Sequence, residues 1–208
     1  MKIGLFPLAA KPYHAGHHAM VEKAATENEK VILFVSTSDR KRKGEFPILG
    51  ADMSRVWKEE IEKILPGNVE VRYGGSPVRN VYAELEAAND GNSPDTYVVY
   101  SDPTDTARNY PEHYRQKNFA DLYEKGQVLF AAEENPAAYT RGEGTPNVSG
   151  TKMRSAMQQC DFDSFKDGMP AELNAESAYK ILCGRDPHEG KKDPQNEVVL
   201  RAFIRSVL

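Results

Sequence analysis

Residues 11–20 read KPYHAGHHAM and hold three of the five histidines in the chain. Histidine titrates close to neutral pH, and imidazole N–H groups can donate hydrogen bonds to a phosphate and stabilise charge developing on it. Lys11 precedes His14 and His17 and adds a mobile positive charge. A zinc site is the weaker alternative, because the spacing lacks the glutamate of H-E-x-x-H and a third ligand. The segment predicts a turn that handles an anion.

A second segment of this kind lies late in the chain, where residues 148–154 read VSGTKMR. Ser149 and Thr151 are typical of a helix start, where exposed backbone N–H groups attract a phosphate. An ordinary helix cap is the plain alternative. Arg154 favours the anion-binding interpretation, because it adds a fixed guanidinium one turn later.

The elements that must position these residues alternate between strand and helix. Short β-rich runs occupy 2–9, 30–38, 69–73, 95–101 and 127–132. Helical spacing of apolar residues occupies 16–28, 52–65 and 78–88. This order predicts an α/β fold, a Rossmann-like open parallel sheet with helices on both faces, and a small helical C-terminal region. Such sheets bind ligands at the carboxyl ends of their strands.

The histidine segment joins the first predicted strand to the first predicted helix. Lys11 and His14 are expected in the loop, Gly16 at the turn and His17 at the start of the helix. The positive end of the helix dipole favours an anion at this place.

Together, the two segments resemble the signatures H-x-G-H and I-S-x-T-x-x-R of the nucleotidyltransferase superfamily. The resemblance covers about residues 1–160, and the form of the second segment is most similar to adenylyltransferases of the nicotinamide-mononucleotide type. Cytidylyltransferase-like enzymes are the next most similar. The chain departs from the family pattern at Leu8, where glycine is usual, and at Ala10, where phenylalanine is usual.

The resemblance implies transfer of a nucleotidyl group from a nucleoside triphosphate to a phosphorylated small-molecule acceptor, with release of pyrophosphate and with Mg²⁺ carried by the triphosphate. ATP is the expected donor and CTP the alternative. The implied catalytic residues are His14, His17, Lys11 and Arg154. The implied nucleotide-binding residues are Pro7, Gly16, Ser101, Asp102, Ser149, Gly150 and Thr151. No protein metal ligand is assigned.

Two functions of other classes stay open. One is a nucleotide-binding sensor or assembly module that has lost turnover, which the departures at Leu8 and Ala10 allow. The other is an aminoacyl-adenylate-forming fragment, since class I synthetases share the H-x-G-H turn. They pair it with a K-M-S-K-S-type loop, which this chain lacks.

Basic residues elsewhere are weaker candidates for binding the acceptor: Arg40, Lys41, Arg79 and Arg108. The run DRKRKGEF (39–46) follows the second strand, and a solvated loop explains it equally well. Residues 101–110 are expected to form a polar loop for base or ribose, or a turn that caps the next helix. Trp57 is interpreted as a core residue rather than a stacking platform.

Composition excludes several classes of protein. The net charge of −4 argues against a general nucleic-acid binder. No apolar run is long enough to span a bilayer, no secretory signal is seen, and two isolated cysteines suggest a reduced, cytoplasmic protein. A catalytic domain is expected over 1–183, followed by a polar linker and a helix over 184–208. That helix would pack on its own domain or on a second copy of the chain, in a homo-oligomer.

Overall fold

The computed structural model describes residues 1–187. They group into two compact units, each assembled from segments that are distant in the sequence. The first comprises 1–9, 19–36 and 65–147, and the second comprises 10–18, 37–64 and the described residues from 148 onward. The predicted C-terminal helix over 198–208 lies outside the described residues.

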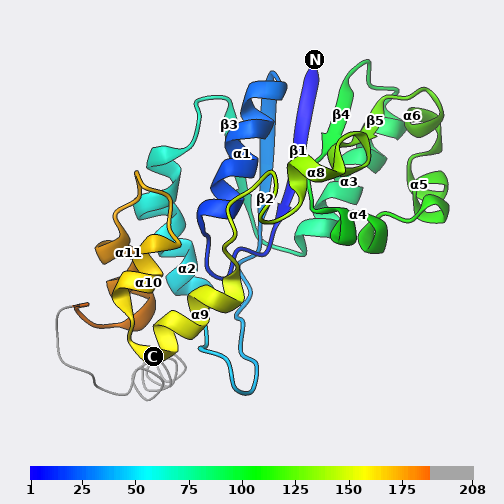
Figure 1. Cartoon of the computed structure of the whole chain (residues 1–208). Helices are drawn as coiled ribbons and strands as arrows, with labels where there is room; N and C mark the ends of the chain where they lie inside the picture. Colours follow the sequence, from blue (N-terminus) through cyan, green and yellow to red (C-terminus); the bar gives the residue numbers. More distant parts are fainter. Residues whose placement is uncertain (188–208) are drawn as a thin grey trace. The chain divides into compact units, whose positions relative to one another are not determined.

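The first unit contains a five-stranded, all-parallel sheet in the order β3-β2-β1-β4-β5 (Figure 1). Its strands are β1 (Lys2–Leu8), β2 (Lys30–Val35), β3 (Val69–Tyr73), β4 (Thr96–Val99) and β5 (Val128–Phe130). The predicted Rossmann-like sheet is therefore confirmed. The strand order reverses beside β1, so the topological switch point lies between the carboxyl ends of β1 and β4.

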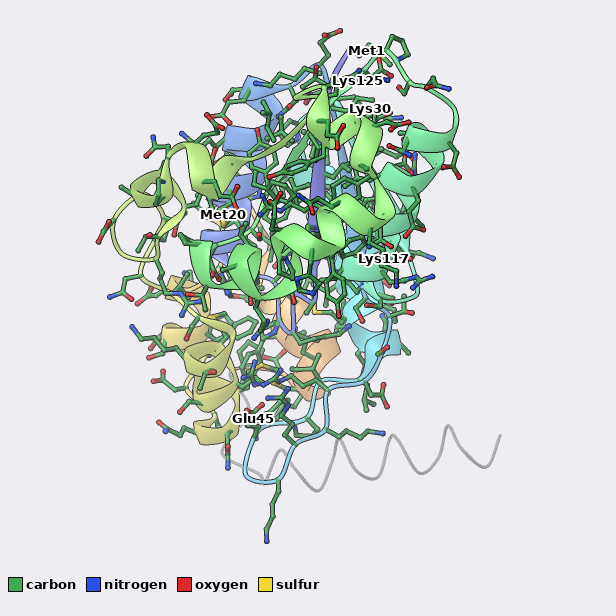
Figure 2. The ribbon with its side chains drawn as sticks, turned by 90° about the vertical axis from the view of Figure 1, so that its right-hand side faces the viewer. Met1, Met20, Lys30, Glu45, Lys117 and Lys125 are labelled. Carbon is green, nitrogen blue, oxygen red and sulfur yellow. The ribbon has the colours of Figure 1, made fainter. Side chains whose placement is uncertain are left out.

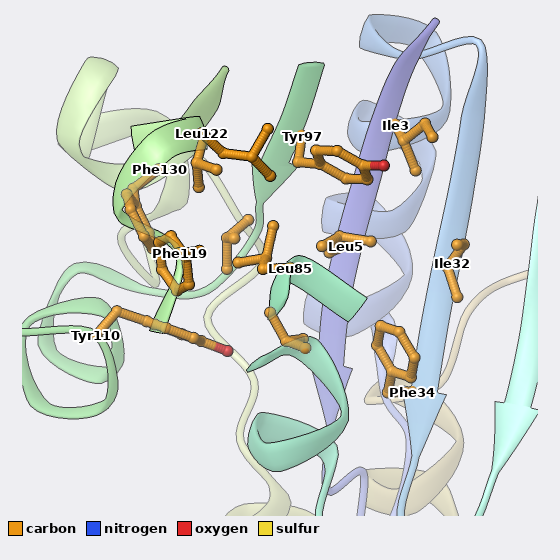
Figure 3. Close-up of a cluster of buried hydrophobic side chains, with 13 residues drawn as sticks. Ile3, Leu5, Ile32, Phe34, Leu85, Tyr97, Tyr110, Phe119, Leu122 and Phe130 are labelled. Carbon is orange, nitrogen blue, oxygen red and sulfur yellow. The ribbon is translucent and has the colours of Figure 1, made fainter. Parts of the chain in front are cut away.

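The two faces of the sheet follow from alternation along the strands. On one face, Leu5, Phe34 and Val99 form a buried cluster with Val81 and Leu85 of α3 (Pro77–Asp90) (Figure 3). Burying such apolar side chains contributes about 1.5–3 kcal/mol each. This cluster fixes α3 against β1 and β2.

The helix α1 (Ala15–Glu27) lies on the opposite face from α3 (Figures 1 and 3). Here Gly4 leaves room, since a Cβ would lie only 3.2 Å from Asn28 and Tyr100 atoms. Asn28 donates to the Tyr100 hydroxyl at 2.7 Å, and that hydroxyl donates to Glu27 at 2.8 Å. The end of α1 is thereby hydrogen-bonded to the segment after β4.

Most of 101–110 is helix, which corrects the expected polar loop and bears out the alternative, a turn that caps the next helix. Asp102 accepts a hydrogen bond from the Asp105 N–H at 2.9 Å and caps α4 (Pro103–Asn109), with proline at its first position. The remaining helices of the first unit are α5 (Glu112–Asn118), α6 (Ala120–Glu124), α7 (Ala131–Glu134) and α8 (Pro136–Tyr139). Strand β2 also ends sooner than predicted, at Val35 rather than at residue 38.

The second unit is helical. Its helices are α2 (Gly50–Val56), α9 (Gly150–Gln159), α10 (Phe162–Asp167) and α11 (Ala175–Cys183). The predicted helix over 52–65 begins at Gly50 and passes through a π-helical turn, Trp57–Ile61, and a 3₁₀ turn, Glu62–Ile64. Trp57 is fully buried against Tyr13, with ring centroids 4.9 Å apart, which confirms it as a core residue.

Across residues 1–187, the structure contains no helix with the length and apolar character that crossing a membrane requires.

Candidate anion-binding site

Arg154 connects the two segments that the sequence predicts to bind an anion, residues 11–20 and 148–154. Its side chain is buried, with 4 % of the residue exposed. Nη1 donates to the backbone carbonyl of Lys11 at 2.7 Å, and Nη2 donates to the Thr151 hydroxyl at 3.1 Å. Residues 143 positions apart are thus in direct contact, and both belong to the second unit.

The start of α9 is built as the sequence predicts. Ser149 is the N-cap, and its hydroxyl accepts from the Lys152 N–H at 3.2 Å. Gly150 follows at the first helical position, where a Cβ would come within 2.9 Å of Arg154 and 3.3 Å of the Lys11 carbonyl oxygen. A larger residue here would have to displace the Arg154 guanidinium. The first N–H groups of a ten-residue helix have no intrahelical acceptor and attract an anion.

His14 and His17 form a stacked pair in the same unit. Their ring centroids are 3.7 Å apart, and the ring planes are inclined by 16°. The His17 backbone N–H donates to the His14 carbonyl at 2.9 Å and approaches Nδ1 of His14 at 3.4 Å. His18 is bonded elsewhere, because its Nδ1 shares a hydrogen bond with the Tyr13 hydroxyl at 3.0 Å. His14 and His18 are both buried, whereas His17 is half-buried.

Gly16 holds this pair against the segment before α9. The structure places it inside the first turn of α1 rather than in the preceding turn, and its backbone does not need a positive φ. A Cβ here would lie 3.2 Å from the His14 ring and 3.4 Å from Val148. The Ala15 N–H also donates to the Gly168 carbonyl at 2.9 Å, which anchors the turn beside α10.

Gly16→Ala is therefore expected to lower activity without lowering stability. Alanine favours a helix by about 1 kcal/mol over glycine, but its methyl group must displace the His14 ring by a few tenths of an ångström. A displacement of 1 Å can cost about 100-fold, so a loss of about three- to tenfold in kcat is expected. Steady-state kinetics beside thermal denaturation measure both effects. A large fall in melting temperature would contradict this explanation.

Lys11 is a buried cation in the same unit, with 8 % of the residue exposed. Burial lowers the pKa of its ammonium to about 8, partly opposed by the negative charge of Asp39. A bound anion would offset this desolvation cost. The preceding residue, Ala10, has a φ of 43° in the left-handed region, which costs about 1–2 kcal/mol for a non-glycine residue.

Lys11 gives a pH dependence of definite sign. Its folded pKa of about 8 lies below the ordinary 10.5, so the unfolded chain binds more protons between these values and stability rises with pH across that window. Affinity for a polyphosphate should change the opposite way, falling by up to about tenfold from pH 7.5 to 9 as Lys11 loses its proton. Titration calorimetry at several pH values measures it, and Lys11→Met should bind weakly with no such dependence. A flat wild-type profile would contradict the assignment.

Arg40 and Lys41 lie on the loop between β2 and α2, where Glu45 is also found (Figure 2). Arg40 donates to both carboxylate oxygens of Glu45, at 2.8 and 3.1 Å. Glu45 also lies 3.0 Å from Nε of Arg154. Lys41 is more exposed and pairs with Asp39 at 2.7 Å. Glu45 was not among the predicted site residues, and its only local signal is that it is an acid at the end of a basic run.

The other candidate residues belong to the first unit. Ser101 is buried, and its hydroxyl shares a hydrogen bond with Thr106 at 2.6 Å. Arg108 is exposed and forms an ion pair with Asp105, whose side chain is also partly exposed. The remaining candidates there are Pro7 on β1, Arg79 on α3 and Asp102 at the cap of α4.

Within residues 1–187, no three or more histidine, cysteine, aspartate or glutamate side chains are grouped so that they could hold a metal ion. The two cysteines, Cys160 and Cys183, are thiols rather than a disulfide. What the second unit offers instead is positive charge with hydrogen-bond donors, which is the chemistry of a phosphate site.

No protein-family model matches the chain, and no curated protein does. The likeness to nucleotidyltransferases therefore rests on the residues and their spacing alone.

Proposed function

We propose that the chain is a nucleotidyltransferase that moves a nucleotidyl group, AMP from ATP, onto a phosphorylated small-molecule acceptor. One observation carries the proposal: Arg154 of the second segment donates to the Lys11 carbonyl of the first, at 2.7 Å. Two stretches that each suggest phosphate binding on their own are thus parts of one cluster. His14 and His17 belong to the same compact unit.

The proposed reaction needs no protein nucleophile. An acceptor oxygen attacks the α-phosphorus, the bond from that phosphorus to the bridging oxygen breaks, and the β- and γ-phosphates leave as pyrophosphate. His14 and His17 would donate hydrogen bonds to the oxygens that gain charge at the α-phosphorus. Arg154, Thr151 and the N-terminus of α9 would hold the leaving pyrophosphate. Alignment of the two reactants supplies a further large part of the rate, as in phosphoryl transfer generally.

Mg²⁺ belongs to the proposed substrate rather than to the protein. The described residues offer donors for a polyphosphate but no carboxylate cluster for a resident cation. A magnesium–triphosphate complex brings its own oxygen ligands and needs only one or two from elsewhere. The metal would neutralise charge on the phosphates, and the chain's cations would orient them. The proposed compartment is the cytoplasm, where two unpaired cysteines would stay reduced.

Pyrophosphate release tests the proposal. The chain would be incubated with Mg²⁺, each of the four ribonucleoside triphosphates, and a panel of phosphorylated acceptors that includes mononucleotides and polyol phosphates. Release that requires one triphosphate and one acceptor is expected, with ATP the preferred donor. Release with CTP alone would make the chain a cytidylyltransferase. Binding of triphosphate with no release across the panel would favour the module without turnover and contradict the proposed activity.

A further inference from the structure

Glu45 bridges two guanidinium groups that come from distant parts of the chain. Its Oε2 lies 3.0 Å from Nε of Arg154 and accepts from Nε of Arg40 at 2.8 Å, while Oε1 accepts from Nη2 of Arg40 at 3.1 Å. Arg154 is buried, whereas Glu45 lies on a loop and keeps about a quarter of its side chain exposed, 27 %. One partly exposed carboxylate thus covers a buried cation.

The loop itself is shaped to present this carboxylate. Arg40 and Ile48 pair as an antiparallel bridge, with N–H to carbonyl distances of 2.8 and 3.0 Å. Gly44 takes a φ of 81°, a left-handed conformation open to glycine, and Glu45 follows it directly. The Glu45 N–H then donates to the Arg42 carbonyl at 3.1 Å. Glu45 therefore lies on a short hairpin whose base is closed by the bridge between Arg40 and Ile48.

The two guanidinium groups are close enough to affect each other. Burial first, and then the positive charge of Arg40, lower the pKa of Arg154. The side chain of Arg40 in turn holds the pKa of Glu45 below its ordinary value. A planar guanidinium binds a carboxylate and a phosphate through the same fork of N–H groups. A phosphate brings more charge and more acceptor oxygens to the same pair of cations.

We propose that the Glu45 carboxylate is an internal substitute for a substrate phosphate, and that triphosphate binding displaces it from Arg154 and Arg40. Arg40 then binds the terminal phosphate of the donor rather than the acceptor. This inference rests on the proposed function, since it assumes that Arg154 holds the polyphosphate. Glu45 therefore competes with a polyphosphate for the two guanidinium groups and lowers the apparent affinity of the chain for it.

Calorimetric titration with inorganic tripolyphosphate, which carries no nucleoside, tests the displacement. Glu45→Gln and Glu45→Ala should each bind tripolyphosphate about three- to tenfold more tightly than wild type. Arg40→Gln should bind more weakly, and adding Glu45→Gln to it should restore part of the loss, because Glu45 still lies 3.0 Å from Arg154. Glu59→Gln removes a comparable charge from an exposed pair with Arg55 in the same unit and should change nothing.

The titrations distinguish failure of the displacement from failure of the proposed function. Unchanged or weaker binding by both Glu45 variants, with wild type binding normally, would overturn the displacement and leave the proposed function standing. An equal gain in Glu59→Gln would show a general charge effect and would also overturn it. If wild type bound neither tripolyphosphate nor ATP, the proposed function would fail and this inference with it.

Discussion

His17→Ala is expected to reduce the rate of pyrophosphate release by about 100- to 1,000-fold while triphosphate still binds. Loss of one well-placed donor to the charge that develops in a transition state has this effect on kcat. Binding should survive because Lys11 and Arg154 keep their charges and their mutual hydrogen bond. Alanine suits the first turn of α1, so the helix should remain intact.

His113→Ala is the matched control for this variant. His113 is exposed on α5 in the first unit, where its ring contacts that of Tyr114 at a tilt of 45°, and its removal should leave turnover and affinity unchanged. Single-turnover kinetics separate the chemical step from binding. A His17→Ala enzyme that kept its rate but bound triphosphate poorly would assign His17 to ground-state binding instead.

Arg154→Ala is expected to abolish measurable polyphosphate binding and to lower stability by about 2–4 kcal/mol. The variant removes a buried cation and leaves the Lys11 carbonyl without this donor and Glu45 without this cation, and such losses are among the larger single-residue effects. Calorimetry with tripolyphosphate measures the loss of binding, and denaturant unfolding measures the loss of stability.

Arg154→Lys separates charge from geometry. An ammonium keeps the positive charge but cannot reach the Lys11 carbonyl, the Thr151 hydroxyl and Glu45 in one plane, so only part of the affinity should return. Arg55→Ala is the control, because Arg55 forms an exposed pair with Glu59 one turn away, and it should cost less than about 0.5 kcal/mol. Full recovery with lysine would contradict the geometric argument.

The sheet was predictable because its signal is local. VEVRY was expected as a strand over 69–73 and is β3, Val69–Tyr73. Its neighbours follow the same logic of short apolar runs between turn residues. A capping turn within 101–110 was one of two interpretations, but the extent of α4, Pro103–Asn109, was not predicted, because these residues are polar and show no apolar stripe. Asp102 followed by proline is the helix-start signal there. The π-helical turn at Trp57 depends on packing, which no periodicity encodes.

The local features of the candidate site were predictable from the sequence, but the contacts between its distant residues were not. Ser149 as a cap follows from residue type and position. The close approach at Gly150 is visible only in the structure. The contact from Arg154 to the Lys11 carbonyl spans 143 residues and follows from tertiary structure alone. Glu45 was overlooked for the same reason, since nothing beside it in the sequence marks Arg154 as its partner.

The most direct test of nucleotidyl transfer follows the label of each phosphate. ATP labelled with ³²P at the α-position, and separately at the γ-position, would be incubated with the chain, Mg²⁺ and the acceptor that supports pyrophosphate release. The account predicts that α-label appears in the acceptor product and γ-label in pyrophosphate. Transfer of γ-label to the acceptor, or its release as orthophosphate, would contradict it and make the chain a kinase or a hydrolase.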